Sequence, residues 1–288
     1  MKGKRIRKAT PYLYLVPALL LAFLFCYRPF FLTILDSLYN VSLNGVRLKF
    51  VGLSNYRRLF ASESFHDSWN NTLRFTAIFA PVNLVITFSL ALLCNTNTKA
   101  SRLSHTLIIL PMAVAMSSAV LILKTIFDPN VGVLNVILNK DIQWFSTARD
   151  AMSMLVVVGL WLDIGFDFLL FSASLRNIPK DLEEEASLEG VSIWERLRYL
   201  EIPLSAPILV FVLSNNIKDA MLMVSPVMIL TEGGPYRSTQ TLVYQMYLEG
   251  FKGGNIALGS AIATVVFLAT FLFLLILLAF QKRRVYFQ

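Results

Sequence analysis

The sequence has little charge. Asp, Glu, Lys and Arg make up only 15% of its 288 residues, whereas hydrophobic residues make up 56%. A typical soluble domain has about 25% charged residues, so this chain has too few to cover a surface that faces water. Its two cysteines and two histidines lie far apart and cannot supply a metal site or a disulfide framework. These shortages exclude an ordinary cytosolic enzyme, a disordered protein and a disulfide-rich scaffold.

Residue patterns for catalysis are missing as well. The sequence contains no glycine-rich phosphate loop, so the chain cannot bind ATP through a P-loop. No Ser/His/Asp set is indicated either. We therefore expect no catalytic residue, no metal and no cofactor in this chain. The net charge of +8 is typical of membrane proteins whose basic loops meet anionic lipid, and we do not expect nucleic-acid binding.

Long apolar runs are abundant instead. A spanning helix needs about 20 mostly apolar residues. The first apolar run has a basic start, but it is too long for a signal peptide and no small-x-small cleavage site follows it, so we expect it to be retained. The pattern predicts an all-α integral membrane protein, with one transmembrane domain over residues 1–288. Its six expected helices cover residues 12–38, 75–95, 104–127, 151–175, 206–230 and 258–281.

Lys and Arg near the helix ends predict the orientation, because cytoplasmic segments carry more of them. With the N-terminus inside, the inner segments hold fourteen such residues and the outer segments nine. The two tails hold eight bases and no acid, which favours both termini in the cytoplasm of a bacterial or archaeal cell. These tail residues are Lys2, Lys4, Arg5, Arg7, Lys8, Lys282, Arg283 and Arg284.

The connection over residues 176–205 is the most informative part of the chain. Asp181 is expected to cap a short helix, and Gly190 suits the left-handed residue that ends it. Ser192 and Glu195 have the spacing of a capping box for a second helix. Pro203 marks the return into the bilayer. The residues therefore predict a helix–turn–helix in the cytoplasm.

This loop holds seven acids and four bases. An amphipathic helix that lies on lipid headgroups would be basic, so a protein surface is the better partner for its apolar residues. A solvated connector packed on its own helix ends is the alternative, and the residues alone leave both open.

The stretch from Asn177 to Gly190, followed by Pro203, resembles the EAA loop of binding-protein-dependent ABC transporter permeases. It is closest to the sugar-type permeases, including the maltose and glycerol-3-phosphate subunits. In that family Glu-Ala-Ala is followed by three residues and Gly. Here Glu184 matches the family Glu, whereas Glu185 and Ala186 stand at the two alanines and Glu189 replaces the usual Asp. Weaker matches occur at Phe50–Tyr56, Leu110–Pro111, Thr231–Pro235, Thr241–Val243 and Tyr247–Phe251.

The resemblance implies a type I ABC importer permease whose loop is a cytoplasmic coupling helix, seated in a cleft of an ATPase subunit. It also implies a second homologous permease, two ATPase subunits that bind ATP and Mg, and an extracytoplasmic binding protein that delivers a sugar or related carbohydrate. The implied ATPase-coupling residues are Glu184, Glu185, Ala186, Glu189, Gly190, Trp194 and Pro203.

Ionisable groups at bilayer depth are costly and face the bundle interior or water. Asp163 and Asp167 share one helix face, with Trp161 and Phe166 beside them. Carboxylates accept hydrogen bonds from sugar hydroxyls, and aromatic rings cover the C–H face. The alternative is a structural pair with Lys218 or with another subunit.

The fifth stretch is interrupted by amides and charges that could line a polar cavity or hold helices together. In the maltose-type permease the residues that contact sugar lie on the fourth and fifth helices, which match residues 162–166 and 216–223 here. For Met223 a packing role is the alternative. The expected substrate-path residues are Trp161, Asp163, Phe166, Asp167, Asn216, Lys218, Asp219 and Met223.

The substrate class has alternatives. A neutral sugar fits the acids and rings, whereas Lys124 and Lys218 leave an anionic solute open, such as glycerol-3-phosphate or an acidic sugar. An ion-coupled secondary transporter is more remote, because such proteins often contain inverted repeats and none is evident. A membrane-embedded enzyme would need a nucleophile or a metal cluster.

Overall fold

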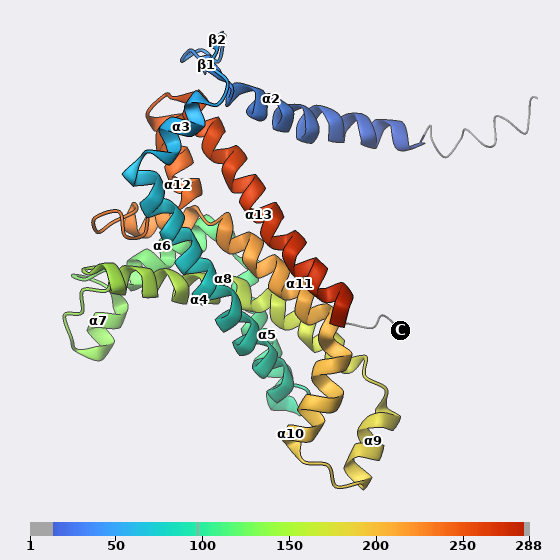
Figure 1. Cartoon of the computed structure of the whole chain (residues 1–288). Helices are drawn as coiled ribbons and strands as arrows, with labels where there is room; N and C mark the ends of the chain where they lie inside the picture. The colour runs from blue at the N-terminus through green and yellow to red at the C-terminus, as the bar shows by residue number, and fades with distance from the viewer. Residues whose placement is uncertain (1–13, 97, 285–288) are drawn as a thin grey trace, which may run out of the picture. The chain divides into compact units, whose positions relative to one another are not determined.

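The computed structural model describes residues 14–96 and 98–284, with side chains up to residue 279. The basic N-terminal tail therefore lies outside the described residues, as do the side chains of the three C-terminal bases used to predict the orientation. The chain divides into two compact units (Figure 1), Met1–Ser62 with Gln245–Val265 and Glu63–Tyr244 with Val266–Gln288.

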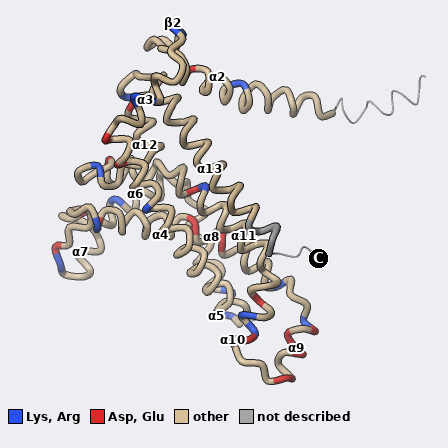
Figure 2. The backbone as a smooth tube through the Cα atoms, viewed as in Figure 1, with Lys and Arg blue, Asp and Glu red and all other residues tan. Residues whose placement is uncertain are grey.

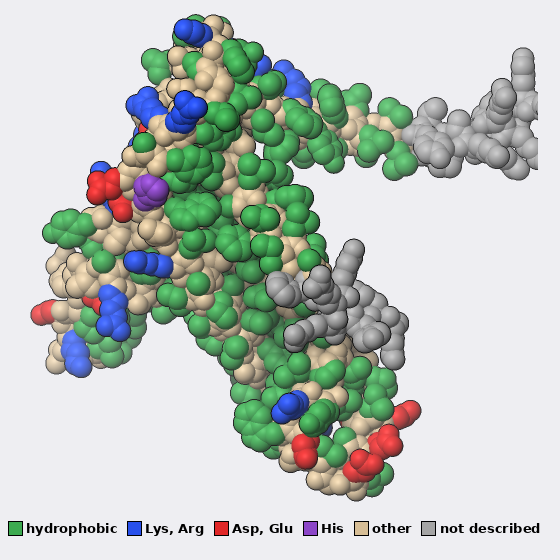
Figure 3. All heavy atoms as spheres, viewed as in Figure 1, with side chains coloured by type: hydrophobic (Ala, Val, Ile, Leu, Met, Phe, Trp, Pro, Cys, Tyr) green, Lys and Arg blue, Asp and Glu red, His purple; other side chains and the backbone are tan. Residues whose placement is uncertain are grey.

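The first unit begins with an apolar helix over Tyr14–Asp36, which includes a π-helical turn, η1 (Phe23–Tyr27), and α2 (Arg28–Asp36). None of its apolar window is buried within the chain, and Figure 3 shows apolar side chains over its surface. The hairpin β1 (Tyr39–Val41) and β2 (Arg47–Phe50) follows it.

The second unit is built on three helices, α4 (Glu63–Leu93), α8 (Ala148–Arg176) and α11 (Ile202–Met221). Their apolar core lies toward the loop that joins α8 to α11. Phe88 of α4 meets Phe171 of α8 edge to face, with the ring centroids 5.2 Å apart. The core residues are Phe88, Ala91, Cys94, Phe168, Phe171, Leu175, Ile178 and Val212.

Shorter helices and helical turns, and one helix of 29 residues near the C-terminus, complete the chain. They are α3 (Ser54–Phe60), α5 (Lys99–Ile109), η2 (Leu110–Ala113), α6 (Met116–Ile126), α7 (Val133–Leu138), α9 (Lys180–Leu188), α10 (Ile193–Arg196), η3 (Leu197–Glu201), η4 (Val227–Thr231), α12 (Leu242–Tyr247), η5 (Leu248–Lys252) and α13 (Ile256–Arg284).

By length and composition, five of the described helices could cross a membrane, or six if one bent pair is a single span. This confirms the helical membrane fold expected from the apolar runs. The third span is not continuous, however: Lys99–Ala113 and Met116–Ile126 meet at 103°. Pro111 lies in the 3₁₀ turn η2, and Val114 has extended backbone. Because proline cannot donate the next helical hydrogen bond, the helix ends there.

The fifth span also differs from the expected range. A helix runs from Ile193 to Met221 without interruption and ends nine residues before the predicted end at residue 230. Pro203 lies in the first turn of α11, directly after the π-helical turn η3. In that position its missing N–H is tolerated, so it does not break the helix.

Candidate functional site

The loop between α8 and α11, residues 176–205, is called the coupling segment below. Its first helix, α9, begins at Lys180 after Pro179, so the expected cap at Asp181 is wrong and this acid lies in the first turn. Pro179 fixes the extended backbone that precedes the helix, and its carbonyl accepts a bond from Leu182 N–H. An acid in the first turn still suits the helix dipole.

The end of α9 agrees with the prediction. Gly190 has φ +69°, in the left-handed region. Its N–H donates to the carbonyl of Ser187, and Val191 N–H donates to the carbonyl of Ala186. These two bonds form a Schellman motif, which fixes the direction in which the chain leaves α9.

The capping box is also confirmed. Ser192 Oγ accepts from Glu195 N–H at 3.3 Å, and the Glu195 carboxylate accepts from Ser192 N–H at 2.9 Å. The helix that starts here continues through η3 into α11, so the second half of the predicted helix–turn–helix is the beginning of the fifth span.

An arginine joins the two arms of the coupling segment. Arg196 donates to Glu183 on α9 at 3.1 Å and to Glu201 on η3 at 2.8 Å. Both bonds are charge-assisted, and the guanidinium has the fork geometry to make them at once. Since Glu201 is buried, this contact holds α9 against the base of α11.

Arg196→Lys is expected to raise amide hydrogen exchange in residues 180–190 several-fold, because one ammonium cannot span both carboxylates. Each half-exposed pair contributes only about 0.5–1 kcal/mol, so the helix should loosen without unfolding the subunit. Arg198→Lys is the matched control, since Arg198 forms no ion pair within the described residues. Equal exchange in both variants would contradict this role.

The expected coupling residues lie on the outside of this segment. Glu184, Glu185, Glu189, Gly190 and Pro203 are exposed, and Figure 2 shows acidic residues gathered on α9. Trp194 is 79% exposed. Ala186 is half-buried and accepts the Schellman bond described above.

A cavity of about 220 Å³ lies among α4, α8 and the end of α11, and is called the membrane pocket. Two half-buried carboxyl groups line it, those of Asp163 and Asp219. Phe75 and Phe79 of α4 supply a pair of stacked rings, with their centroids 5.2 Å apart. The other lining residues are Met116, Gly159, Leu162, Ala220, Leu222, Met223, Val224, Ser225 and Pro226.

A small residue on α8 and the bend before α6 determine the shape of this pocket. A Cβ at Gly159 would come within 3.1 Å of the Phe79 ring, so a larger residue there would push the ring away from α8. The bend before Met116 brings the start of α6 to the same cavity. Lys218 pairs with Asp219 at 3.0 Å and donates to Asn215 at 2.8 Å, which leaves Asp163 as the pocket carboxyl without an ion pair among the described residues.

Five of the eight expected substrate-path residues do not line the membrane pocket, namely Trp161, Phe166, Asp167, Asn216 and Lys218. Asp167 and Asn216 are buried, and both meet Asn83 of α4, whose Nδ2 donates to Asp167 at 2.7 Å and to Asn216 at 3.2 Å. This polar cluster joins the three main helices and does not line the pocket. Trp161 and Phe166 are 37% and 38% exposed and are not among the residues that line it.

The expectations missed Asn83, because the second apolar stretch was considered only for its lack of charge. They also missed Phe75 and Phe79, since a phenylalanine in an apolar run carries no sign of a pocket. Outside the spans, the pKa of Asp128 is lowered because its carboxylate accepts from the N–H groups of Val131 and Asn130. It orders the turn after α6 and lines neither site.

Over residues 83–285 the chain matches the family described as binding-protein-dependent transport system inner membrane component. It belongs to this family, and its function is that of a permease in an ABC importer, as the resemblance of residues 177–203 to the EAA loop implied.

Particular relatives are close in sequence. The sn-glycerol-3-phosphate transport system permease protein UgpA of Yersinia pestis bv. Antiqua is 34% identical over 282 residues, which cover 96% of each chain. The protein of the same description from Pectobacterium atrosepticum is 33% identical, again over 96% of each chain.

Solved structures share the fold. A bacterial ABC transporter involved in the import of the acidic polysaccharide alginate matches with a TM-score of 0.87 and 18% identity, over 99% of each chain. Another structure holds the bacterial alginate ABC transporter in complex with an alginate pentasaccharide-bound periplasmic protein, with a TM-score of 0.85 and 18% identity, over 97% of this chain and 96% of that one.

Proposed function

We propose that this permease forms, with a second homologous permease, the pathway for a sugar or related carbohydrate delivered by an extracytoplasmic binding protein. The observation that carries the substrate class is the membrane pocket, where Asp163 and Asp219 lie beside Phe75 and Phe79. Carboxylates accept hydrogen bonds from hydroxyl groups, and stacked rings offer an apolar face to the C–H groups of a sugar. The glycerol-3-phosphate and alginate named for the relatives are both rich in hydroxyl groups.

Two separate ATPase subunits would supply the energy and would hold the ATP and Mg. Support comes from the coupling segment, where Leu188, Ile193 and Trp194 are 88%, 85% and 79% exposed. Large apolar side chains exposed beside acids are typical of a protein interface rather than of a solvated connector. Glu184 and Glu185 would then meet basic groups of the ATPase.

The helix over Tyr14–Asp36 supports a second permease. It is long enough to span the membrane, and none of its apolar stretch is buried within this chain. We place both termini and the coupling segment in the cytoplasm. An even number of spans returns the chain to its starting side, and the basic tails favour the inner side. The family description places the chain in the inner membrane.

Asp163→Asn is expected to raise the KM for uptake about tenfold, because a hydrogen bond to a charged group contributes about 1.5–3 kcal/mol. Uptake is measured in proteoliposomes that hold both permeases and both ATPases, with the binding protein outside and ATP inside. Asp141→Asn, an exposed acid in the connection before α8, is the control and should leave KM unchanged.

Two results would overturn the proposal. An unchanged KM in Asp163→Asn would remove the pocket from the solute path. Uptake that needs no ATP and collapses when an ionophore dissipates the ion gradient would favour the secondary-transporter alternative.

A further inference from the structure

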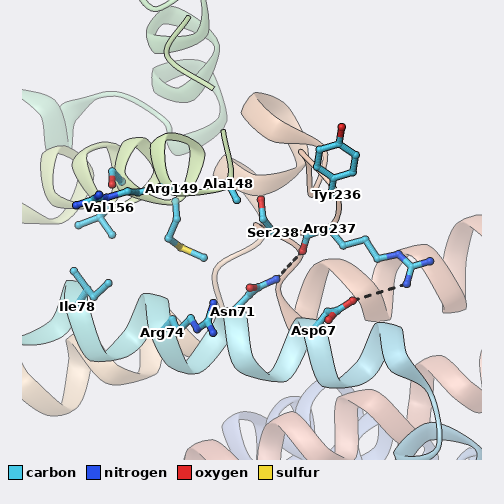
Figure 4. A pocket seen from close by; sticks show the side chains of 12 residues that line it. Asp67, Asn71, Arg74, Ile78, Ala148, Arg149, Val156, Tyr236, Arg237 and Ser238 are labelled. Carbon is cyan, nitrogen blue, oxygen red and sulfur yellow. Dashed lines mark hydrogen bonds and ion pairs between the residues drawn. The ribbon is translucent and has the colours of Figure 1, made fainter. Parts of the chain in front are cut away.

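Another cavity lies at the N-terminal end of α8, the opposite end of this helix from the coupling segment, and is called the outer pocket. Its volume is about 710 Å³. The walls are α4, the first turns of α8 and the loop over residues 236–238 (Figure 4). None of the expected substrate-path residues lines it.

The outer pocket carries excess positive charge. Arg74 on α4 and Arg149 on α8 both line it, and neither forms an ion pair with any residue that the structure describes. A third arginine, Arg237, lies 3.9 Å from Asp67. The lining of the outer pocket therefore contains three guanidinium groups and one carboxylate. The positive end of the α8 dipole lies at Ala148, and Asp150 in the first turn offsets it without lining the pocket.

The loop over residues 236–238, which forms one wall of the outer pocket, has an unfavourable backbone conformation. Tyr236 and Arg237 have φ of 50° and 60°, in the left-handed region that side chains rarely adopt. Asn71 of α4 fixes the loop by donating to the carbonyl of Arg237 at 2.7 Å. Beside it, Ser238 lines the outer pocket, and its buried Oγ has no hydrogen-bond partner among the described residues.

The outer pocket and the membrane pocket follow one another along the same face of α8. Arg149, Ser153 and Val156 line the first, and Gly159 and Asp163 line the second. These positions are three or four residues apart, which keeps them on one helix face. At 1.5 Å per residue, the two ends of this series are separated by about 21 Å.

We propose that the outer pocket binds the anionic group, a phosphate or a carboxylate, of a hydroxyl-bearing solute before the solute reaches the membrane pocket. Arg74 and Arg149 hold the anion, and Ser238 donates to it. This inference rests on the proposed function, and it narrows the substrate class to anionic carbohydrates and polyol phosphates. Guanidinium groups are well suited to this, because their fork of donors matches carboxylate and phosphate oxygens.

A solute fits this site better than an acidic side chain of the binding protein. The volume lies within the range of about 300–1,000 Å³ that small-molecule pockets occupy, whereas a docking surface needs no such hollow. Because the outer pocket and the membrane pocket lie on the same face of α8, a solute bound in the first can move along that face to the second. A docking contact with the binding protein does not require this alignment.

The test uses the complete transporter in proteoliposomes with its binding protein. Arg74→Gln and Arg149→Gln are compared with wild type and with Arg58→Gln, an exposed arginine on α3. The anionic probes are sn-glycerol 3-phosphate and an alginate pentasaccharide, and the neutral probes are glycerol and maltopentaose. Each pocket variant should slow uptake of the transported anionic probe about tenfold, the effect of losing one charge-assisted hydrogen bond. Arg58→Gln should have no effect.

Four outcomes would overturn the inference. Wild type could carry only neutral probes, or the pocket variants could transport anions normally. The variants could weaken binding of loaded and unloaded binding protein equally, which would assign the arginines to that partner. The defect could also require phosphatidylglycerol in the vesicles and vanish in phosphatidylcholine, which would assign them to lipid phosphate. If the proposed function is wrong, the result is different, because wild-type uptake then does not depend on ATP. Uptake by Arg74→Gln and Arg149→Gln can still be compared with wild type in that case.

Discussion

Replacing Gly190 with valine is expected to reduce ATP-driven uptake at least tenfold while the subunit still inserts and assembles. At φ +69° a left-handed residue other than glycine costs about 1–2 kcal/mol, and a β-branched residue is the least tolerant of that conformation. No atom lies within 4 Å of a Cβ added at this position, so the effect would come from the backbone alone. The Schellman bonds at Ser187 and Ala186 would break, and α9 would leave its position relative to α10.

Gly190→Asn is the matched control for this prediction, because asparagine adopts the left-handed conformation with little penalty. Uptake and ATP hydrolysis are measured together in proteoliposomes. We expect Gly190→Asn to keep both near the wild-type level, and Gly190→Val to hydrolyse ATP with little uptake. If valine and asparagine behave alike, the direction of the chain after α9 does not control coupling.

The second prediction with a large expected effect concerns the stability of the folded subunit. Asn83→Ala is expected to lower the free energy of unfolding by about 2 kcal/mol, since it leaves buried polar groups of Asp167 and Asn216 without their partner. Hydrogen bonds between membrane helices contribute about 0.6–2 kcal/mol each, and this amide makes two of them, to α8 and α11. Unfolding is followed by SDS titration of the purified subunit in mixed micelles.

Thr76→Ala provides the comparison on the same helix. Within the part of the chain that the structure describes, the Thr76 hydroxyl bonds only to the carbonyl of Thr72 on α4, so its loss should change the unfolding free energy by less than about 0.5 kcal/mol. The KM for uptake separates the two roles open to Asp167. A structural role predicts that Asp167→Asn leaves KM unchanged, whereas a tenfold increase, as expected for Asp163→Asn, would show that Asp167 contacts the solute.

The coupling segment could be predicted in detail because its determinants are local. Gly190, Ser192 and Glu195 each act on backbone groups within four residues, and all three do what the sequence predicts. The family assignment followed from this segment. The N-cap of α9 was misplaced by two positions, because Asp181 and Pro179 both suit a helix N-terminus and the proline determines it.

What could not be predicted depends on residues distant in the sequence. Asn83 and Asp167 are 84 positions apart, and Arg74 and Arg149 were considered only as charges that orient the helices. Asn83 meets Asp167 in one cluster, and Arg74 and Arg149 line one pocket, because of the way α4 packs against α8. The hydrophobic periodicity of the sequence does not specify this packing. The 103° bend before Met116 could not be predicted either, since a proline in an apolar run is compatible with a kinked helix or with two separate helices.

The continuity of α8 has a mechanical consequence. Its 29 residues contain no proline, so at 1.5 Å per residue it is a connecting rod about 43 Å long. One end carries the outer pocket, the middle carries the membrane pocket, and the other end leads into the coupling segment. A rod of this length that tilts by about 10° about its centre moves each end by roughly 4 Å, in opposite directions. A push applied at Arg176 therefore shifts the arginine wall near Ala148 by about the width of a water molecule or more, without any change in the helix itself.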